Sequence, residues 1–410
     1  MHSAVSSAVK KINIKTLTLL AIAFLVGWYI GHQDVSAKWQ NYRPIIKVEN
    51  KEPPKEITVD FKLFWDTWDF VTKTYLDKSA IDQQKMFYGA ISGMVAALGD
   101  PYTVFLPPEQ QKISKEELNG SFEGVGIQLG FNKEKRLVVI APLDGTPAQK
   151  AGIRASDIII EIESEDTTGI SLPEAVKRIR GEKGTQVSLT IFREGEEETR
   201  TFKLVRDTIV VKSVTLKMEK TSSGKDVALI KLSRFGERTN DEWMAAVSEA
   251  LSNSPEAVIL DLRNNPGGLL DGAVFIASEF LASGDVVLSE DSQGRRSSYK
   301  VNREGKLTKI QLVVLINKGS ASASEIVAGA LQDRKRAKLV GTKSFGKGTI
   351  QEAEQLPGGT GIHITTAKWL TPDGKWVNET EGLTPDEILE DEQKDDEVDE
   401  QLKKALEILN

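Results

Sequence analysis

A chain of 410 residues, 40% of them hydrophobic, is longer than one hydrophobic core normally serves, so two or three domains are expected. The 53 basic and 60 acidic residues give a net charge of -7, which argues against nucleic acid as a partner. Cysteine is absent and two of the three histidines lie in the N-terminal tail, so only His363 remains for an imidazole-based triad.

Residues 1–33 are predicted to be a membrane anchor or a signal segment. Positions 16–31 carry no charge, follow three lysines and end near the interfacial pair Trp28 and Tyr29. Their length lies between a signal-peptide core and the roughly 20 residues of a comfortable span. We favour an uncleaved single-pass anchor at the cell membrane with the catalytic region extracytoplasmic. Cleavage after the small residues 35–37, followed by secretion, and a buried core helix are the alternatives.

The next segments predict a linker and then a small helical module. Residues 34–59 are polar, contain three prolines and show no sustained apolar periodicity, as in a linker. Residues 61–76 and 83–98 place apolar side chains at spacings of three and four. This spacing predicts two amphipathic helices in an N-terminal module over residues 60–110.

The rest of the chain shows two different patterns of apolar residues and then an acidic C-terminal segment. Residues 111–206 hold short β-rich runs punctuated by glycine and aspartate, with a single helix-like stretch over 172–180, and predict a compact β-rich domain. Residues 207–385 alternate apolar strands with helices, which predicts an α/β domain whose parallel sheet is covered on both faces. Residues 386–410 begin with an acidic run and are predicted to form a solvated C-terminal helix.

The strand over 311–317 runs into a turn that contains Ser322, and residues after it have helical spacing. A serine at a strand-to-helix turn is a candidate nucleophile, because the helix start offers unpaired N–H groups, with that of Ala323 nearest, to an oxyanion. The alternative is structural, since Ser322 followed three positions later by Glu325 also fits a capping box. Ser320 and Ser324 leave the assignment open.

Two glycine-containing loops supply candidate partners. The turn over 264–268 precedes a helix and could offer the N–H of Gly268 as a second oxyanion donor, or be an ordinary turn. Lys347 lies between two glycines after a short strand, and acts as a base for serine only where burial keeps its amine neutral. Most lysines are simply solvated. Gln351, four positions later, could orient the amine.

Other chemistries fit less well. Gly341, Gly346 and Lys347 match the start of a phosphate-binding GxxxxGK loop, but Gly348 stands where a Ser or Thr magnesium ligand is required. His363 alternates with β-branched residues, which favours a strand residue over a base or metal ligand. No metal cluster is evident and no cofactor is expected.

Five motifs in order give a family resemblance, at residues 99–109, 124–127, 261–268, 319–325 and 345–351. Over residues 60–410 the chain resembles the carboxyl-terminal processing proteases, the tail-specific serine peptidases of family S41. The resemblance implies a multidomain α/β fold: a ClpP/crotonase-like α/β protease core with an inserted PDZ-like domain and the small helical module. It also implies that Ser322 is the nucleophile, Lys347 the general base and Gln351 the residue that holds the lysine, with Gly268 and Ala323 supplying oxyanion-hole amides.

In similar proteins the PDZ loop binds a terminal carboxylate through successive N–H groups while the peptide adds as a strand. Here that loop is Gly124, Val125, Gly126 and Ile127, and Arg180 is a candidate contact between PDZ domain and protease. The resemblance implies substrates with free C-termini, a serine-type endopeptidase activity and a homodimer. A PDZ-based peptide-binding or scaffold protein with an idle protease core and an acyl-CoA enzyme of the crotonase type are the alternatives.

Overall fold

The computed structural model describes residues 14–32, 35–40, 43–48, 59–390 and 399–410. The chain forms two compact units, Met1–Asp82 and Gln83–Asn410. The boundary between them falls inside the predicted helical module, between its two helices.

The first unit holds the elements α1 (Ile14–His32), β1 (Val35–Gln40), β2 (Arg43–Val48), α2 (Lys62–Thr74) and the 3₁₀ turn η1 (Lys78–Ala80). Strands β1 and β2 pair antiparallel, so part of the segment predicted as a linker forms a hairpin. Helix α2 is one of the two predicted amphipathic helices, and Phe64, Trp65 and Trp68 contact one another along it.

Among the helices that the structure describes, none combines the length and apolar composition needed to cross a membrane. The predicted span over residues 16–31 falls on α1, whose side chains are described only at positions 18–27. The remainder of that prediction lies outside the described residues.

The second unit begins with the other predicted helix, α3 (Gln83–Ala96), followed by β3 (Val104–Leu106) and α4 (Pro108–Asn119). Pro108 suits the first turn of α4, where its missing N–H is not needed. The helix ends because Gly120 adopts the left-handed conformation (φ 62°). β4 (Ser121–Gly124) then leads into the β-rich domain, and β11 (Asp207–Val210) leads out of it, antiparallel to β4.

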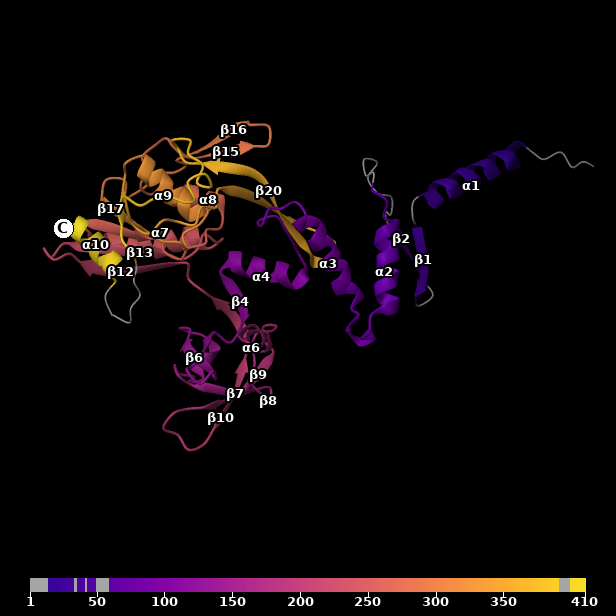
Figure 1. Ribbon diagram of the computed structural model, residues 1–410, viewed down its shortest axis with the longest axis horizontal. Helices are drawn as coiled ribbons and strands as arrows, with labels where there is room; N and C mark the ends of the chain where they lie inside the picture. The colour runs from indigo at the N-terminus through magenta and orange to yellow at the C-terminus, as the bar shows by residue number, and fades with distance from the viewer. Residues whose placement is uncertain (1–13, 33–34, 41–42, 49–58, 391–398) are drawn as a thin grey trace, which may run out of the picture. The chain divides into compact units, whose positions relative to one another are not determined.

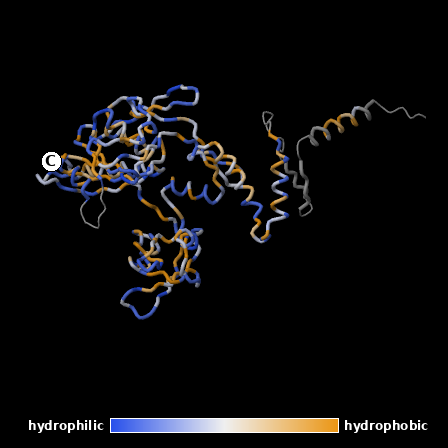
Figure 2. Tube along the Cα trace, in the orientation of Figure 1, coloured by the Kyte–Doolittle hydropathy of each residue, from blue (hydrophilic) through white to orange (hydrophobic). Residues whose placement is uncertain are grey.

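The β-rich domain has a sheet of strand order β10-β9-β7-β6-β5, with β8 pairing with β7. Its elements are β5 (Ile127–Phe131), β6 (Leu137–Pro142), α5 (Pro147–Lys150), β7 (Ile158–Ile162), β8 (Glu165–Asp166), α6 (Leu172–Ile179), β9 (Gln186–Phe192) and β10 (Arg200–Val205). Alternate residues of β9, Val187, Leu189 and Ile191, are buried in its core together with Ala175 and Ile179 of α6. The turn between β9 and β10 is hydrophilic (Figure 2).

The sheet of the α/β domain has the order β12-β13-β14-β17-β18-β21, and all neighbouring strands are parallel except that the edge strand β12 is antiparallel to β13. The strands are β12 (Val214–Lys220), β13 (Asp226–Leu232), β14 (Ala257–Asp261), β17 (Gln311–Ile316), β18 (Lys338–Gly341) and β21 (Glu387–Ile388). Helices cover both faces, as the nearly continuous apolar runs predict (Figure 1). The predicted α/β fold class is confirmed.

The two faces use alternate residues of the same strands. Val258 and Leu260 of β14 pack with α7 (Thr239–Ser252), α8 (Leu270–Ala277) and α9 (Ala323–Asp333). Ala257 and Ile259 pack on the opposite face with α10 (Glu400–Ile408). Within the range predicted as a helix, 386–410, Glu387 and Ile388 instead pair with β18 as a strand, and the described helix is α10, capped by Asp399.

A second, antiparallel sheet lies beside this domain, with the order β16-β15-β20-β19 and β3 paired to β20. It consists of β15 (Asp285–Asp291), β16 (Arg296–Lys300), β19 (Thr349–Gln355) and β20 (Gly361–Leu370), with the 3₁₀ turn η2 (Pro357–Gly359) between the last two. The loop before β19 carries Lys347, so this sheet places that residue near the end of β17.

Candidate active site

One cavity of about 360 Å³ brings the predicted catalytic residues together. Its lining includes Gly268, Ser322, Ala323, Lys347 and Gln351, together with His363 and Trp369 of β20. The residues come from the turn after β14, the start of α9, the loop before β19 and the hairpin β19–β20. Segments far apart in the sequence thus meet at the carboxyl ends of the parallel strands.

Ser322 is the N-cap of α9 and has a strained backbone (φ 53°, ψ -113°). The neighbouring serines are completely buried and bind backbone: Ser320 Oγ donates to Leu262 O (2.8 Å) and Ser324 Oγ donates to Asn265 O (2.9 Å). Both pin the start of α9 to the turn after β14. Of the three serines, only Ser322 lines the cavity.

Two backbone N–H groups beside Ser322 are free to bind an anion. The Phe235 N–H donates to Gly267 O (2.9 Å) and the Leu269 N–H to Phe235 O (2.8 Å), so this strand-like pairing turns the Gly268 N–H to the opposite side. Ala323 is the first residue of α9. Across the described ranges, neither N–H has a protein acceptor.

The two loops are in close contact, because a Cβ added to Gly267 would lie 2.9 Å from the Ser322 Cβ. The turn that carries the Gly268 N–H therefore lies against the start of α9, which carries the Ala323 N–H. This arrangement can stabilise a tetrahedral oxyanion.

Lys347 is half-buried, and its Nζ lies over the Tyr102 ring, 4.6 Å from the centroid. Its backbone is fixed on both sides: the N–H donates to Glu325 Oε2 (2.9 Å) and the carbonyl accepts from Trp369 Nε1 (2.9 Å). Burial lowers the pKa of the Lys347 amine, while the charges of Asp100 and Glu325 oppose this effect. Within the described residues, no hydrogen bond joins this amine to the Ser322 hydroxyl.

Glu325, whose spacing from Ser322 predicts only a helix cap, also binds the loop that carries Lys347. Its buried carboxylate accepts from the N–H groups of Ser322 (2.7 Å), Gly346 (2.6 Å) and Lys347 (2.9 Å), and from Ser344 Oγ (2.6 Å). Burial raises the pKa of Glu325, and these hydrogen bonds work against that rise. One side chain therefore joins the loop of the serine to the loop of the lysine.

Gln351 does not contact the lysine amine here. Its amide donates to Thr349 Oγ1 (2.8 Å) and to Thr365 Oγ1 (3.0 Å) across the hairpin β19–β20. The predicted role of Gln351 in holding the amine stays a prediction.

His363 lies opposite Ala353 in β20, as its alternation with β-branched residues predicts, and it also lines the cavity. Burial and the Lys347 charge lower the pKa of His363.

The loop after Gly341 runs into the strand β19 and not into a helix, so it cannot cradle phosphates as a GxxxxGK loop does. The part of the chain that the structure describes holds no group of side chains suited to a metal ion.

The predicted carboxylate-binding loop connects β4 to β5. The carbonyls of Val125 and Gly126 accept from Ala148 N–H (3.0 Å) and Leu143 N–H (2.9 Å), which fixes the loop. Gly126 has φ 77°, and an added Cβ would lie 2.4 Å from Thr146, so only glycine fits. β5 is the edge strand of its sheet, and its outer edge has no strand partner in the described ranges. Such an edge can accept a peptide strand.

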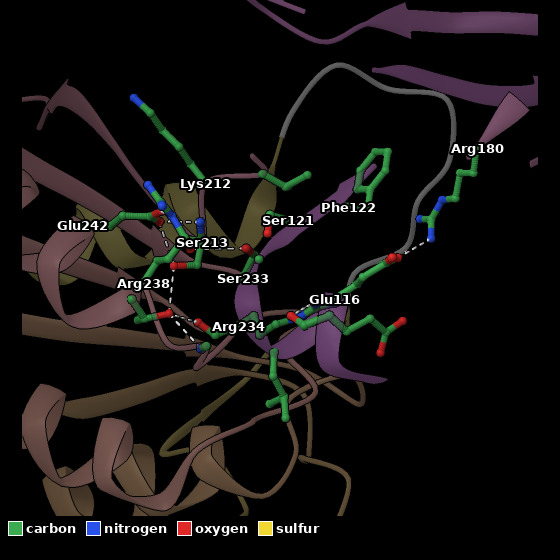
Figure 3. Close-up of a pocket in the computed structure, with 16 residues that line it drawn as sticks. Glu116, Ser121, Phe122, Arg180, Lys212, Ser213, Ser233, Arg234, Arg238 and Glu242 are labelled. Atoms are coloured by element: carbon green, nitrogen blue, oxygen red, sulfur yellow. Dashed lines mark hydrogen bonds and ion pairs between the residues drawn. The ribbon is translucent and has the colours of Figure 1, made fainter. Parts of the chain in front are cut away.

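Arg180 caps the C-terminus of α6 and does not line the cavity of Ser322. Its guanidinium lies 4.3 Å from the centroid of the Phe122 ring and donates to Glu116 Oε2 (3.2 Å), as Figure 3 shows. Both partners belong to the segment that leads into the β-rich domain. A second cavity contains this group together with Arg234, whose guanidinium donates to the Glu117 carbonyl. Arg180 thus connects α6 to α4.

Comparison with known proteins identifies the family. The sequence model of peptidase family S41 matches residues 226–389, that of the PDZ domain residues 110–192, and that of the activating protease CtpB N-terminal domain residues 21–110. A carboxyl-terminal-processing protease of Synechocystis sp. is 38% identical over 84% of each chain. Another, of Picosynechococcus sp., is 39% identical over 85% of this chain and 88% of the relative. The solved structure of a photosystem II D1 C-terminal processing protease is similar, with a TM-score of 0.50 and 32% identity over 84% of this chain and 96% of that one. The chain belongs to peptidase family S41, the carboxyl-terminal processing proteases, which are serine hydrolases, and it carries a PDZ domain.

Proposed function

We propose that the chain is an endopeptidase in which Lys347 activates Ser322, and in which the PDZ domain selects proteins by their free C-termini. The observation that carries the proposal is the single cavity lined by Ser322, Lys347, Gly268 and Ala323. A serine flanked by two free backbone amides and a half-buried amine is sufficient for acyl transfer without histidine.

The reaction proceeds in two halves. The neutral Lys347 amine takes the hydroxyl proton as Ser322 Oγ attacks the peptide carbonyl, and the Gly268 and Ala323 N–H groups bind the resulting oxyanion. The ammonium then gives its proton to the leaving amine as the C–N bond breaks. In the second half the neutral amine takes a proton from a water molecule, which attacks the acyl ester, and the ammonium then returns this proton to Ser322 Oγ as the acyl C–O bond breaks.

Tail selection is supported by the geometry of the PDZ domain. A peptide that pairs with the open edge of β5 would bring its terminal carboxylate to the loop over residues 124–127. An amidated terminus has no negative charge to be bound by backbone N–H groups, so it should bind more weakly.

The test uses two peptides of identical sequence, one with a free C-terminus and one amidated. We expect kcat/KM to be at least about tenfold higher for the free carboxylate, because hydrogen bonds to a charged group contribute roughly 1.5–3 kcal/mol. Product masses identify the cleavage site, and Ser322→Ala is the control that should leave both peptides intact. Equal values of kcat/KM for the two peptides would contradict the proposal that the enzyme selects free C-termini. Persistence of both peptides with the unmodified chain would favour a binding protein with an idle core.

We further propose that the N-terminal part places the enzyme outside the cytoplasm at the cell membrane and pairs two copies. An uncharged stretch over residues 16–31 after three lysines supports attachment. Exposed aromatic side chains on α2, with Trp65 60% and Phe70 67% exposed, support a homodimer. The protein should be recovered in the membrane fraction, and recovery in the soluble fraction would contradict membrane attachment. After extraction with detergent, light scattering should give twice the mass of one chain, and the mass of a single chain would contradict the homodimer.

A further inference from the structure

The loop over residues 99–103 has no role in the mechanism above, although it forms the first part of the family motif at residues 99–109. It connects α3 to β3, and β3 pairs with β20 through Val104 opposite His363. Asp100 accepts from the Tyr102 N–H (3.0 Å) and from Thr103 Oγ1 (2.7 Å). The Thr103 hydroxyl in turn accepts from the Thr365 N–H (3.0 Å) of β20. These contacts hold the loop in one conformation against the strand that borders the cavity.

The rigid loop presents the Tyr102 ring to the amine of Lys347, at 4.6 Å from Nζ to the ring centroid. An ammonium at this distance is attracted by the negative face of an aromatic ring, whereas a neutral amine is not. Burial disfavours the Asp100 carboxylate, but hydrogen bonds from Thr103, Thr365 and Tyr102 outweigh burial and lower the pKa of Asp100. The loop therefore offers both a ring face and a negative charge to the protonated lysine.

The same network reaches the third residue of the predicted catalytic set. The Gln351 amide donates to Thr365 Oγ1 (3.0 Å), and the Thr365 N–H donates to the Thr103 hydroxyl (3.0 Å), which donates to Asp100 (2.7 Å). Gln351 is thus connected to the loop that holds the lysine and not to the amine itself. Its contacts support the position of the Tyr102 ring.

We propose that Tyr102 is a positioning residue for the base: its ring holds the protonated Lys347 amine at rest, and the amine turns to Ser322 once it has lost its proton. The inference rests on the proposed Ser322–Lys347 pair. Two acidic groups besides the ring act on the amine, Asp100 from the loop and Glu325 from α9, and both favour the ammonium. The charge of Lys347 also acts on His363 of β20, which lines the same cavity. None of these three groups is altered when the ring is replaced.

The test is the ionisation of Lys347 measured directly in the full chain. Competitive acetylation of lysines across pH, quantified by mass spectrometry of the peptide that contains Lys347, gives the midpoint of its titration without relying on activity. Tyr102→Leu keeps an apolar side chain but removes the ring. We expect its midpoint to fall by roughly 0.5 to 1 pH unit, since cation–π attraction stabilises only the charged form. Tyr102→Phe keeps the ring face and should restore the midpoint.

Tyr88→Leu is the matched control, because the Tyr88 ring contacts Phe105 (centroids 5.9 Å apart) and not the lysine. It should leave the midpoint unchanged. Tyr102→Met is the second ring-free variant, in case the leucine variant fails to fold, and thermal unfolding shows which variants are folded. The acidic limb of the kcat/KM profile should move with the labelling midpoint in both ring-free variants.

An unchanged midpoint in a folded ring-free variant, or an equal fall in Tyr102→Phe, would overturn the inference. A midpoint that falls as expected while Lys347→Met keeps full activity would support the ring contact but contradict the proposed base. The two hypotheses therefore fail in different measurements.

Discussion

Replacing Lys347 with methionine should lower kcat/KM on a C-terminal peptide by about 10²- to 10⁴-fold, the usual contribution of a general base. Methionine fills a similar unbranched volume but cannot accept a proton, so the loop should keep its shape. The backbone contacts of Lys347 with Glu325 and Trp369 do not involve the side chain that is lost. Steady-state kinetics measure the loss of activity, and thermal unfolding shows whether the variant is still folded.

Lys343→Met is the matched control. Lys343 lies in the same loop, partly exposed, with its amine 3.9 Å from Glu381, and exposed pairs of this kind contribute little. Its activity should stay within about twofold of the parent. A folded Lys347→Met enzyme with parental activity would contradict the role of this lysine as base.

The pH profile of the parent follows from the same amine. Burial lowers the pKa of Lys347, and the charges of Asp100 and Glu325 reduce this effect without reversing it. Only the neutral form can accept the serine proton, so activity should be lost as pH falls through the pKa of the folded enzyme and be present above it. The midpoint is expected below the usual lysine value of roughly 10.4.

Those parts of the fold that depend on the pattern within a single helix or strand could be predicted from the sequence. The spacing of apolar residues predicted α2 and α3, and the nearly continuous apolar runs predicted strands β13, β14 and β17 of a parallel sheet covered on both faces. The position of Ser322 between a strand and a helix likewise predicted that it lies at the carboxyl end of the sheet. The helix predicted near residue 387 was wrong because β18 offered Glu387 a strand partner that no local pattern shows.

Contacts between distant loops could not be predicted in this way. The capping-box spacing of Ser322 and Glu325 showed one contact of that carboxylate, but not the three donors that Ser344, Gly346 and Lys347 bring from another loop. The direction of the Gln351 side chain depends on a register shift between Ile350 and Gln351 in the pairing of β19 with β20. Spacing along the chain does not encode such a shift.

Replacing Gly268 with alanine is expected to reduce kcat/KM by about 10²- to 10³-fold, the cost of losing one oxyanion donor. Gly268 has φ 139°, and an added Cβ would lie 2.1 Å from the Phe235 carbonyl oxygen. Since that oxygen belongs to backbone paired with Leu269, the turn must move rather than a side chain. Movement of the turn displaces the Gly268 N–H from Ser322, and it should also lower the thermal unfolding midpoint.

The control separates backbone strain from this displacement. Gly294, in the turn between β15 and β16, also has a positive φ (74°), but an added Cβ there meets no atom within 4 Å. Gly294→Ala should therefore show the cost of a positive φ without any clash, and leave kcat/KM within about twofold. If Gly268→Ala lost stability but kept its activity, the oxyanion would have to be bound by the Ala323 N–H and some other donor. The contact between Phe235 and the turn matters for catalysis only if activity falls further in Gly268→Ala than in Gly294→Ala, which has a positive φ but no clash.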